Sequence, residues 1–145
     1  MIAVKTGALE LIEAWSETDA DRALRFAFPI FSQAGAKSTS VVYFEVDPGK
    51  HIGTHTDSAE EVVLILAGEG EAVVGDERGP VEAGTLAVIP AMVPHDVINT
   101  GEEPLRVAGF FSSSTVVSVF EDPFAPIGKR IVGTPLPEEE DVATI

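Results

Sequence analysis

The chain has 145 residues, enough for one domain with a single core, and 45% of them are hydrophobic, which is typical of a folded protein. Nine basic residues stand against 24 acidic ones, so the net charge is −15, and a nucleic-acid or anionic-membrane partner would be repelled. The absence of cysteine excludes disulfides, thiolate metal ligands and a cysteine nucleophile.

The N-terminal part predicts an arm followed by a strand. Residues 1–15 alternate loosely between polar and apolar side chains, and charged residues interrupt the apolar core that a secretory signal needs, so we expect a soluble cytoplasmic protein. The run RALRFAFPIF at 22–31 is apolar and aromatic. Pro29 within it favours an edge strand or a strand end, because proline cannot donate a hydrogen bond to a neighbouring strand.

Short strands separated by glycine-containing turns fill the middle of the chain. Residues 38–46 are rich in β-branched and aromatic side chains and are followed by a turn at 47–49. Further strands are expected at 52–57, 61–66, 70–74, 86–89, 94–98, 105–112 and 115–120, with a turn at 75–79. This pattern, without a helix-length periodic segment, indicates an antiparallel β-sandwich or barrel.

Three parts of the chain follow from this pattern. We divide it into N-terminal strands and arm at 1–36, a barrel at 37–120, and a C-terminal extension at 121–145. The extension ends in an acidic tail that we expect to be mobile. The longest strongly apolar run, at 62–67, is far below the ~20 residues that span a bilayer, so no membrane partner is expected.

All three histidines lie between residues 49 and 99, close to acidic residues. His55 and Asp57 are two residues apart, so in an extended strand they point to the same face. Glu61 opens the next strand after a turn, and His95 begins another strand. Two imidazoles and one carboxylate with open positions match the ligand set of non-haem iron sites. Asp57 would be a further oxygen ligand, a partner of a ligand, or a catalytic base.

These two windows resemble the cupin superfamily. Its first motif is Gly, five residues, His-x-His, three or four residues, Glu, six residues, Gly; its second is Gly, five residues, Pro-x-Gly, two residues, His, three residues, Asn. The matching positions are Gly49, His55, Glu61 and Gly68 in the first, and Gly84, Pro90, His95 and Asn99 in the second. Met92 stands at the usual glycine of the second motif, and Asp57 at the second histidine of the first.

The resemblance implies an all-β fold, a double-stranded β-helix, with the metal inside one end of the barrel and frequently a homodimer. It does not imply a reaction, because this fold hosts dioxygenases, isomerases, epimerases, lyases, decarboxylases, storage proteins and sensors. It also supplies a precedent for the departure at Asp57, since some cupin dioxygenases that act on aromatic amino-acid derivatives hold iron by His, Glu and His.

The identity of residue 57 bears on the choice of metal. A carboxylate in place of an imidazole makes the site harder, which favours Fe(II) or Mn(II) over copper and leaves Zn or Ni as alternatives. The opposing interpretation is that Asp57 has abolished metal binding. His51 lies about 13 Å before His55 in a straight strand, so it is a candidate ligand only if the turn before it bends inward, and otherwise lies at the pocket mouth or surface.

Strand alternation gives an approximate lining for the pocket. Val63 shares a face with Glu61, and Val97 with His95, so both valines are predicted to be pocket walls. The remaining candidates are one of Tyr43 and Phe44, one of Phe110 and Phe111, and the basic residues Arg22, Arg25 and Arg106, the only ones expected to reach a pocket. Such walls favour a small, partly apolar or aromatic ligand over a phosphorylated sugar.

An enzyme is favoured, with three hypotheses for what the barrel does. The first is an Fe(II)-type dioxygenase that acts on a small, partly apolar or aromatic substrate. The second is a non-redox isomerase, lyase or decarboxylase, in which the metal polarises a carbonyl and Asp57 is the general base. The third is a non-catalytic protein that binds a small ligand.

Overall fold

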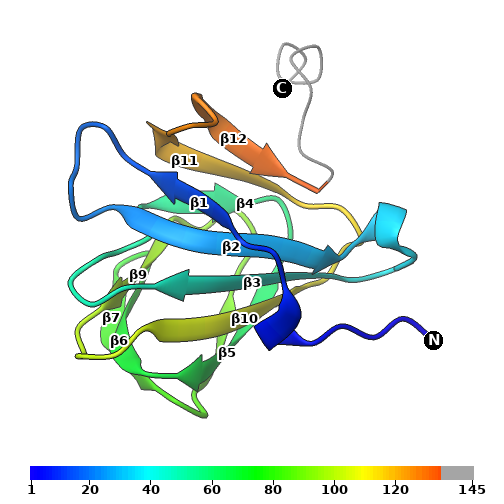
Figure 1. Cartoon of the computed structure of the whole chain (residues 1–145), viewed down its shortest axis with the longest axis horizontal. Helices are drawn as coiled ribbons and strands as arrows, with labels where there is room; N and C mark the ends of the chain where they lie inside the picture. Colours follow the sequence, from blue (N-terminus) through cyan, green and yellow to red (C-terminus); the bar gives the residue numbers. More distant parts are fainter. Residues whose placement is uncertain (135–145) are drawn as a thin grey trace.

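Two six-stranded antiparallel sheets face each other in the computed structural model, which describes residues 1–134 (Figure 1). In the first sheet the order is β1 (Ile12–Trp15), β2 (Ala23–Ile30), β3 (Ser40–Val46), β10 (Leu105–Phe111), β5 (Glu61–Ala67) and β8 (Leu86–Ile89). In the second it is β12 (Lys129–Gly133), β11 (Val117–Phe124), β4 (His55–Asp57), β9 (His95–Asn99), β6 (Glu69–Val74) and β7 (Glu77–Glu82). Two short 3₁₀ helices, η1 (Thr6–Ala8) and η2 (Ser32–Ala34), complete the described elements. The all-β prediction is confirmed.

The core lies between the two sheets and follows from the alternation of side chains along each strand. On β5, Glu61, Val63 and Ile65 are buried, whereas the intervening residues are more exposed. Phe44 on β3 and Val107 on β10 are paired across these strands, and both are buried. The middle of the first sheet therefore presents apolar side chains inward, together with one carboxylate, that of Glu61.

Asn99 closes one end of this core by holding backbone groups. Its side-chain amide donates hydrogen bonds to the carbonyls of Val46 and Glu103, and its side-chain oxygen accepts one from the backbone N–H of Gly101. Asn99 is 1% exposed, so these bonds satisfy a buried polar side chain.

Two strands differ from the sequence-based expectation because they lie at sheet edges. β7 covers part of the region predicted as a turn. Among residues 1–134 its one partner strand is β6, and only Val81 of its six residues is buried. β12 was not predicted, and in the described part of the chain it pairs with β11 alone. An edge strand that faces water on one side needs few apolar residues, so neither segment shows the alternation that marks a central strand.

The prediction that Pro29 marks an edge strand is wrong, whereas its placement near a strand end is confirmed. β2 lies between β1 and β3. β1 pairs with residues 23–26 of β2, and the pairing of β2 with β3 is irregular between Ala27 and Ile30. Pro29 falls in that irregular stretch, where a missing N–H removes no regular ladder bond.

The predicted boundaries at residues 36 and 120 stay predictions. β1 and β2 join the first sheet, and β11 runs across residue 120 to Phe124, so strands on either side of each boundary share the same sheets. The acidic tail lies outside the described residues. Within residues 1–134, no helix has the length and apolar character needed to cross a membrane.

Candidate metal centre

Two neighbouring strands of one sheet and one strand from the opposite sheet bring the predicted ligands together. His55 and Asp57 lie on β4, and His55 is paired directly with His95 on β9. Glu61 begins β5 in the other sheet. All four side chains are buried, with residue exposures of 2–7%. His55 and Asp57 therefore point to the same side of β4, as their spacing predicted, and that side faces the interior.

The donor atoms of His55, Asp57 and His95 converge. One ligand atom from each residue lies within 4.8 Å of the others. Nε2 of His95 is 3.0 Å, and Nε2 of His55 3.9 Å, from Oδ2 of Asp57. Glu61 lies beside this group, with its Oε1 3.7 Å from Nε2 of His95. The three-residue cluster thus contains Asp57 as its carboxylate, and Glu61 is adjacent.

Two of these donor atoms fit a bound cation. Nε2 of His95 and Oδ2 of Asp57 are buried, yet within residues 1–134 neither has a hydrogen-bond partner, because their close approach lacks hydrogen-bond alignment. Buried polar atoms are almost always satisfied. Two unsatisfied atoms that face each other beside a second imidazole are what a divalent metal with nitrogen and oxygen ligands would satisfy.

Backbone and side-chain partners orient these ligands. Nδ1 of His55 donates to the carbonyl of Gly53 at 2.8 Å, and Nδ1 of His95 donates to the carbonyl of Val93 at 2.9 Å. These bonds leave Nε2 of each ring to face the cluster. The hydroxyl of Ser118 donates to Oδ1 of Asp57, which leaves Oδ2 directed at the histidines.

The pKa values show how the side chains of the site distribute their charge. Burial, reinforced by His95, lowers the pKa of His55 to about 4. Burial also acts to lower the pKa of His95, but the carboxylates of Asp57 and Glu61 outweigh it and raise that pKa to about 10. Burial raises the pKa of Glu61. For Asp57 burial acts the same way, yet the close approach of His95, the charges of both histidines and the hydrogen bond from Ser118 hold its pKa below the ordinary value. Protonated His95 therefore places a positive charge beside the carboxylates of Asp57 and Glu61, where a metal cation would place one when bound.

Gly109 and Ser118 are site residues that the sequence reasoning missed. Gly109 lies on β10, and a Cβ there would clash with Oε2 of Glu61. The available signal was a glycine inside a predicted strand, which often marks a close approach. Ser118 is paired with Asp57 across β11 and β4. Its role depends on the register between distant strands, and local sequence does not show that register.

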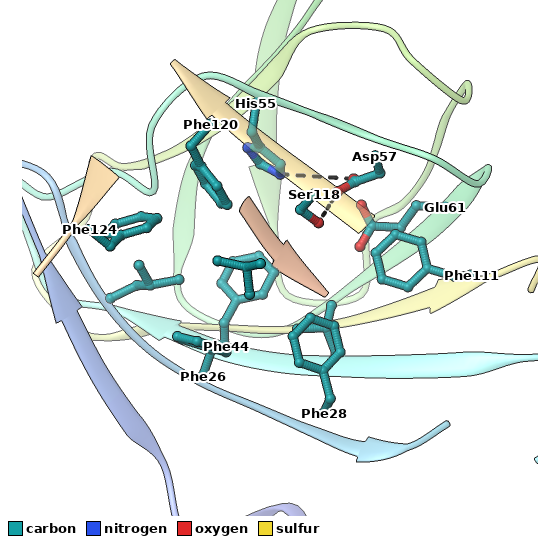
Figure 2. A pocket seen from close by; sticks show the side chains of 13 residues that line it. Phe26, Phe28, Phe44, His55, Asp57, Glu61, Phe111, Ser118, Phe120 and Phe124 are labelled. Atoms are coloured by element: carbon teal, nitrogen blue, oxygen red, sulfur yellow. Dashed lines mark hydrogen bonds and ion pairs between the residues drawn. The ribbon is translucent and has the colours of Figure 1, made fainter. Parts of the chain in front are cut away.

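An apolar cavity opens at the cluster (Figure 2). His55, Asp57, Glu61 and Ser118 form its polar end, and its walls include six phenylalanines. These are Phe26, Phe28, Phe44, Phe111, Phe120 and Phe124. The space in which the centre of a water-sized molecule can move is about 60 Å³. The cavity therefore suits a small ligand with an apolar or aromatic body.

The structure resolves which of the predicted wall residues face the cavity. Phe44 and Phe111 line it, whereas Tyr43 is buried elsewhere and Phe110 is 42% exposed. Val63 and Val97 are buried in the core but are not among the lining residues. Their assignment as pocket walls is wrong. They share a face with the ligands, as alternation predicts, but this face continues into the core beyond the cavity.

His51 lies outside the cluster. Its Nδ1 is 2.7 Å from Oδ2 of Asp96, and its Nε2 is 3.0 Å from Oδ2 of Asp19. Burial acts to lower the pKa of His51, but these two carboxylates outweigh it and raise the pKa. Because both ring nitrogens are engaged, the candidate role of His51 as a ligand is wrong.

None of the three predicted arginines lines the cavity. Arg25 pairs with carboxylates on the surface, and Arg106 donates to the hydroxyl of Tyr43. Arg22 is buried behind the wall, where its guanidinium stacks on Phe124. The cavity lining found in residues 1–134 contains no lysine or arginine, so the cavity offers no cation to a phosphate or carboxylate group.

The cupin domain family matches residues 42–114, which is half of the chain. This chain is a cupin. Auxin-binding protein 1 of Arabidopsis thaliana is 29% identical over 102 residues, which cover 63% of this chain and 52% of that protein. The cupin thus spans about half the length of this curated relative.

Two solved structures are similar in fold. An oxalate decarboxylase of Bacillus subtilis described with Mn(II) centres has a TM-score of 0.62 and 19% identity, and the match covers 74% of this chain and 30% of that one. The polyketide cyclase RemF of Streptomyces resistomycificus has a TM-score of 0.61 and 20% identity, with coverages of 77% and 78%. These similarities confirm the double-stranded β-helix. At these identities they show the fold alone.

Proposed function

We propose that this cupin holds a divalent metal at His55, Asp57 and His95 and oxidises a small apolar or aromatic molecule with O2. One observation carries the proposal: two imidazole nitrogens and an unsatisfied carboxylate oxygen converge at the polar end of a phenylalanine-lined cavity. Two histidines and one carboxylate with open positions are the ligand set of non-haem Fe(II) oxygenases.

The donor set favours Fe(II) or Mn(II), with Zn or Ni as alternatives. Asp57 adds a hard oxygen ligand to two imidazoles, and Glu61 is near enough to add a second. The Mn(II) centres of the similar oxalate decarboxylase support a divalent metal in this fold. When bound, the metal would supply O2 activation beside the substrate.

The protein's own side chains account for binding and proton handling. The phenylalanine walls would hold the apolar body of the substrate and exclude water. Ser118 fixes Asp57 through Oδ1, so Asp57 is suited to ligation. Glu61 is a buried carboxyl group with a raised pKa. It can therefore hold a proton at the polar end of the cavity and release it to a neighbouring basic atom.

The same property of Glu61 favours a second candidate function, a non-redox isomerase, lyase or decarboxylase. In such an enzyme Glu61 or Asp57 would move a proton to or from the substrate, and a bound metal would act as a Lewis acid. A third candidate is a non-catalytic binding protein, which the name of auxin-binding protein 1 supports.

Metal analysis combined with oxygen uptake tests the proposal. The purified chain is freed of metal, loaded anaerobically with Fe(II) or Mn(II), and mixed with O2 and a panel of phenols, catechols and indoles. We expect one metal per chain and O2 uptake that depends on a panel member. Stoichiometric metal without O2 uptake, together with rearrangement or cleavage of a panel member, would favour the non-redox candidate.

Matched variants test the assignment of the ligands. His95→Gln should abolish metal binding, because it removes a converging Nε2. His51→Gln should retain metal, since His51 lies between Asp19 and Asp96. If the wild-type chain takes up no divalent metal, both enzyme candidates fail.

The homodimer and the cytoplasmic location stay predictions, and analytical ultracentrifugation measures the first of these.

A further inference from the structure

We propose that Arg22 is a positioning residue for His55. Its guanidinium contacts the backbone segment whose carbonyl accepts the hydrogen bond from Nδ1 of His55, and it also packs against the aromatic side chains next to the imidazole. Arg22 immediately precedes β2 and is 3% exposed. The proposal concerns how the protein orients one ligand, and it rests on the proposed metal site only for its metal-binding test.

The first link runs through the backbone at residues 52–53. Nε of Arg22 donates to the carbonyl of Ile52 at 3.1 Å. The next residue, Gly53, has a φ of +99°, and a Cβ there would clash with the Arg22 side chain. Gly53 accepts the hydrogen bond from Nδ1 of His55. The acceptor that sets the tautomer of His55 thus belongs to a glycine packed directly against the guanidinium.

The second link runs through aromatic rings. Cζ of Arg22 lies 3.7 Å from the ring centroid of Phe124 and 5.3 Å from that of Phe120. Phe120 is stacked on the His55 imidazole, with centroids 4.4 Å apart and an interplanar angle of 18°. Figure 2 shows Phe120 beside His55, with Phe124 further along the same wall. Nη1 of Arg22 also donates to the carbonyl of Pro123 at 3.2 Å, which fixes the strand that carries both rings.

If Arg22 served only to stabilise the fold, a guanidinium would not be required at this position. The buried arginine has one nitrogen, Nη2, without a hydrogen-bond partner within residues 1–134. Burying a charged group is costly, and an apolar side chain of similar length would pack at this position without that cost. What the guanidinium adds is a planar fork that bonds two carbonyls and lies against a ring at once. Through the backbone at residues 52–53 and through the ring of Phe120, these contacts act on two sides of the His55 imidazole.

Arg22→Met in the full chain tests the proposal, because methionine keeps an unbranched apolar stem and removes the fork. Arg25→Met is the matched control: Arg25 lies on β2, and it pairs on the surface with Glu45 and Asp47. Two measurements are made on each variant. Titration of the metal-free protein with Mn(II) gives the affinity, and two-bond ¹H–¹⁵N imidazole spectra of the metal-free protein give the tautomer of His55.

We expect Arg22→Met to weaken Mn(II) binding by about 10- to 100-fold, as is typical when a partner of a metal ligand is lost. We also expect His55 to change from one tautomer, protonated at Nδ1, to a mixture, while the signals of His95 stay in place. Arg25→Met should change neither measurement. A lower melting temperature with wild-type Mn(II) affinity and an unchanged His55 tautomer would overturn the proposal and leave Arg22 as a structural tie.

Arg22→Lys keeps the test decisive if the methionine variant does not fold. Lysine retains the charge and the stem but has no fork to bond both carbonyls, so the tautomer mixture is expected again, and a single unchanged tautomer would overturn the proposal. If the wild-type chain binds no Mn(II), the proposed function fails. The tautomer of His55 in the metal-free protein then decides this inference by itself.

Discussion

Raising the pH from about 7 to about 8.5 should strengthen the binding of a divalent metal, because the metal and a proton compete for Nε2 of His95. This imidazole is 2% exposed and lies close to two carboxylates, those of Asp57 and Glu61. Their negative charge stabilises the imidazolium. A metal ligand must be the neutral form, so binding requires the proton to leave.

The size of the effect follows from the pKa of His95, which is raised to about 10. At pH 7 roughly one chain in 1,000 carries neutral His95, so the apparent affinity is about 1,000-fold below its limit and rises about tenfold per pH unit. An ordinary histidine, with a pKa near 6.5, would show little change above pH 7. His55 adds nothing to the slope, because its pKa of about 4 leaves it neutral throughout.

Calorimetric titration with Mn(II) in buffers of different ionisation heat measures both the slope and the released proton. About one proton should be released per metal near pH 7. His51→Gln is the control and should show the same slope, because His51 contacts Asp19 and Asp96 and not the cluster. An affinity that stays constant from pH 7 to 8.5, without proton release, would refute the argument that His95 holds a proton in the metal-free site.

Two further predictions concern stability. Gly109→Ala should lower the free energy of unfolding by about 1–3 kcal/mol, because the new Cβ clashes with Glu61. Gly79→Ala is the control, since its Cβ would meet nothing within 4 Å. If both variants are equally stable in urea, the crowding at Glu61 is contradicted. The raised folded-state pKa of His51 means that its stabilising contribution is complete below about pH 6.5 and is lost as the pH rises. His51→Gln should therefore destabilise the protein more at pH 6 than at pH 8.5, and an equal loss at both would contradict the two ion pairs.

Much of the fold was predictable because central strands bury one face and carry β-branched residues. The strands predicted at 38–46 and 61–66 correspond to the central strands β3 and β5 and differ from them by a residue or two. The strand predicted at 86–89 has the limits of β8, which lies at a sheet edge. Asp57 could be placed beside His55 because both lie on one short strand. Alternation within a strand is a local property, and the sequence displays it directly.

Other features of the site depend on packing between strands that are distant in sequence. Alternation could not choose between Tyr43 and Phe44, because both are buried, Phe44 toward the cavity and Tyr43 against other contacts. Ser118 reaches Asp57 only through the pairing of β11 with β4. The partners of His51 come from a turn before β2 and from β9, so no spacing near His51 predicted them.

Much of the cavity wall comes from a different part of the chain than the donor atoms. His55, Asp57, Glu61 and His95 all lie within the segment 42–114 that matches the cupin family. Much of the wall lies outside it, on β2, β11 and β12: Leu24, Phe26, Phe28, Phe120, Phe124 and Val132. Substitutions at Leu24, Phe26 and Phe28 on β2 or Val132 on β12 can reshape the cavity and leave in place the two β11 contacts to the donor residues, Phe120 on His55 and Ser118 on Asp57. Part of the wall is therefore separate from the donor residues, and exchanging the wall residues of β2 and β12 between related barrels, with Ser118 and Phe120 kept, is a direct route to altered selectivity.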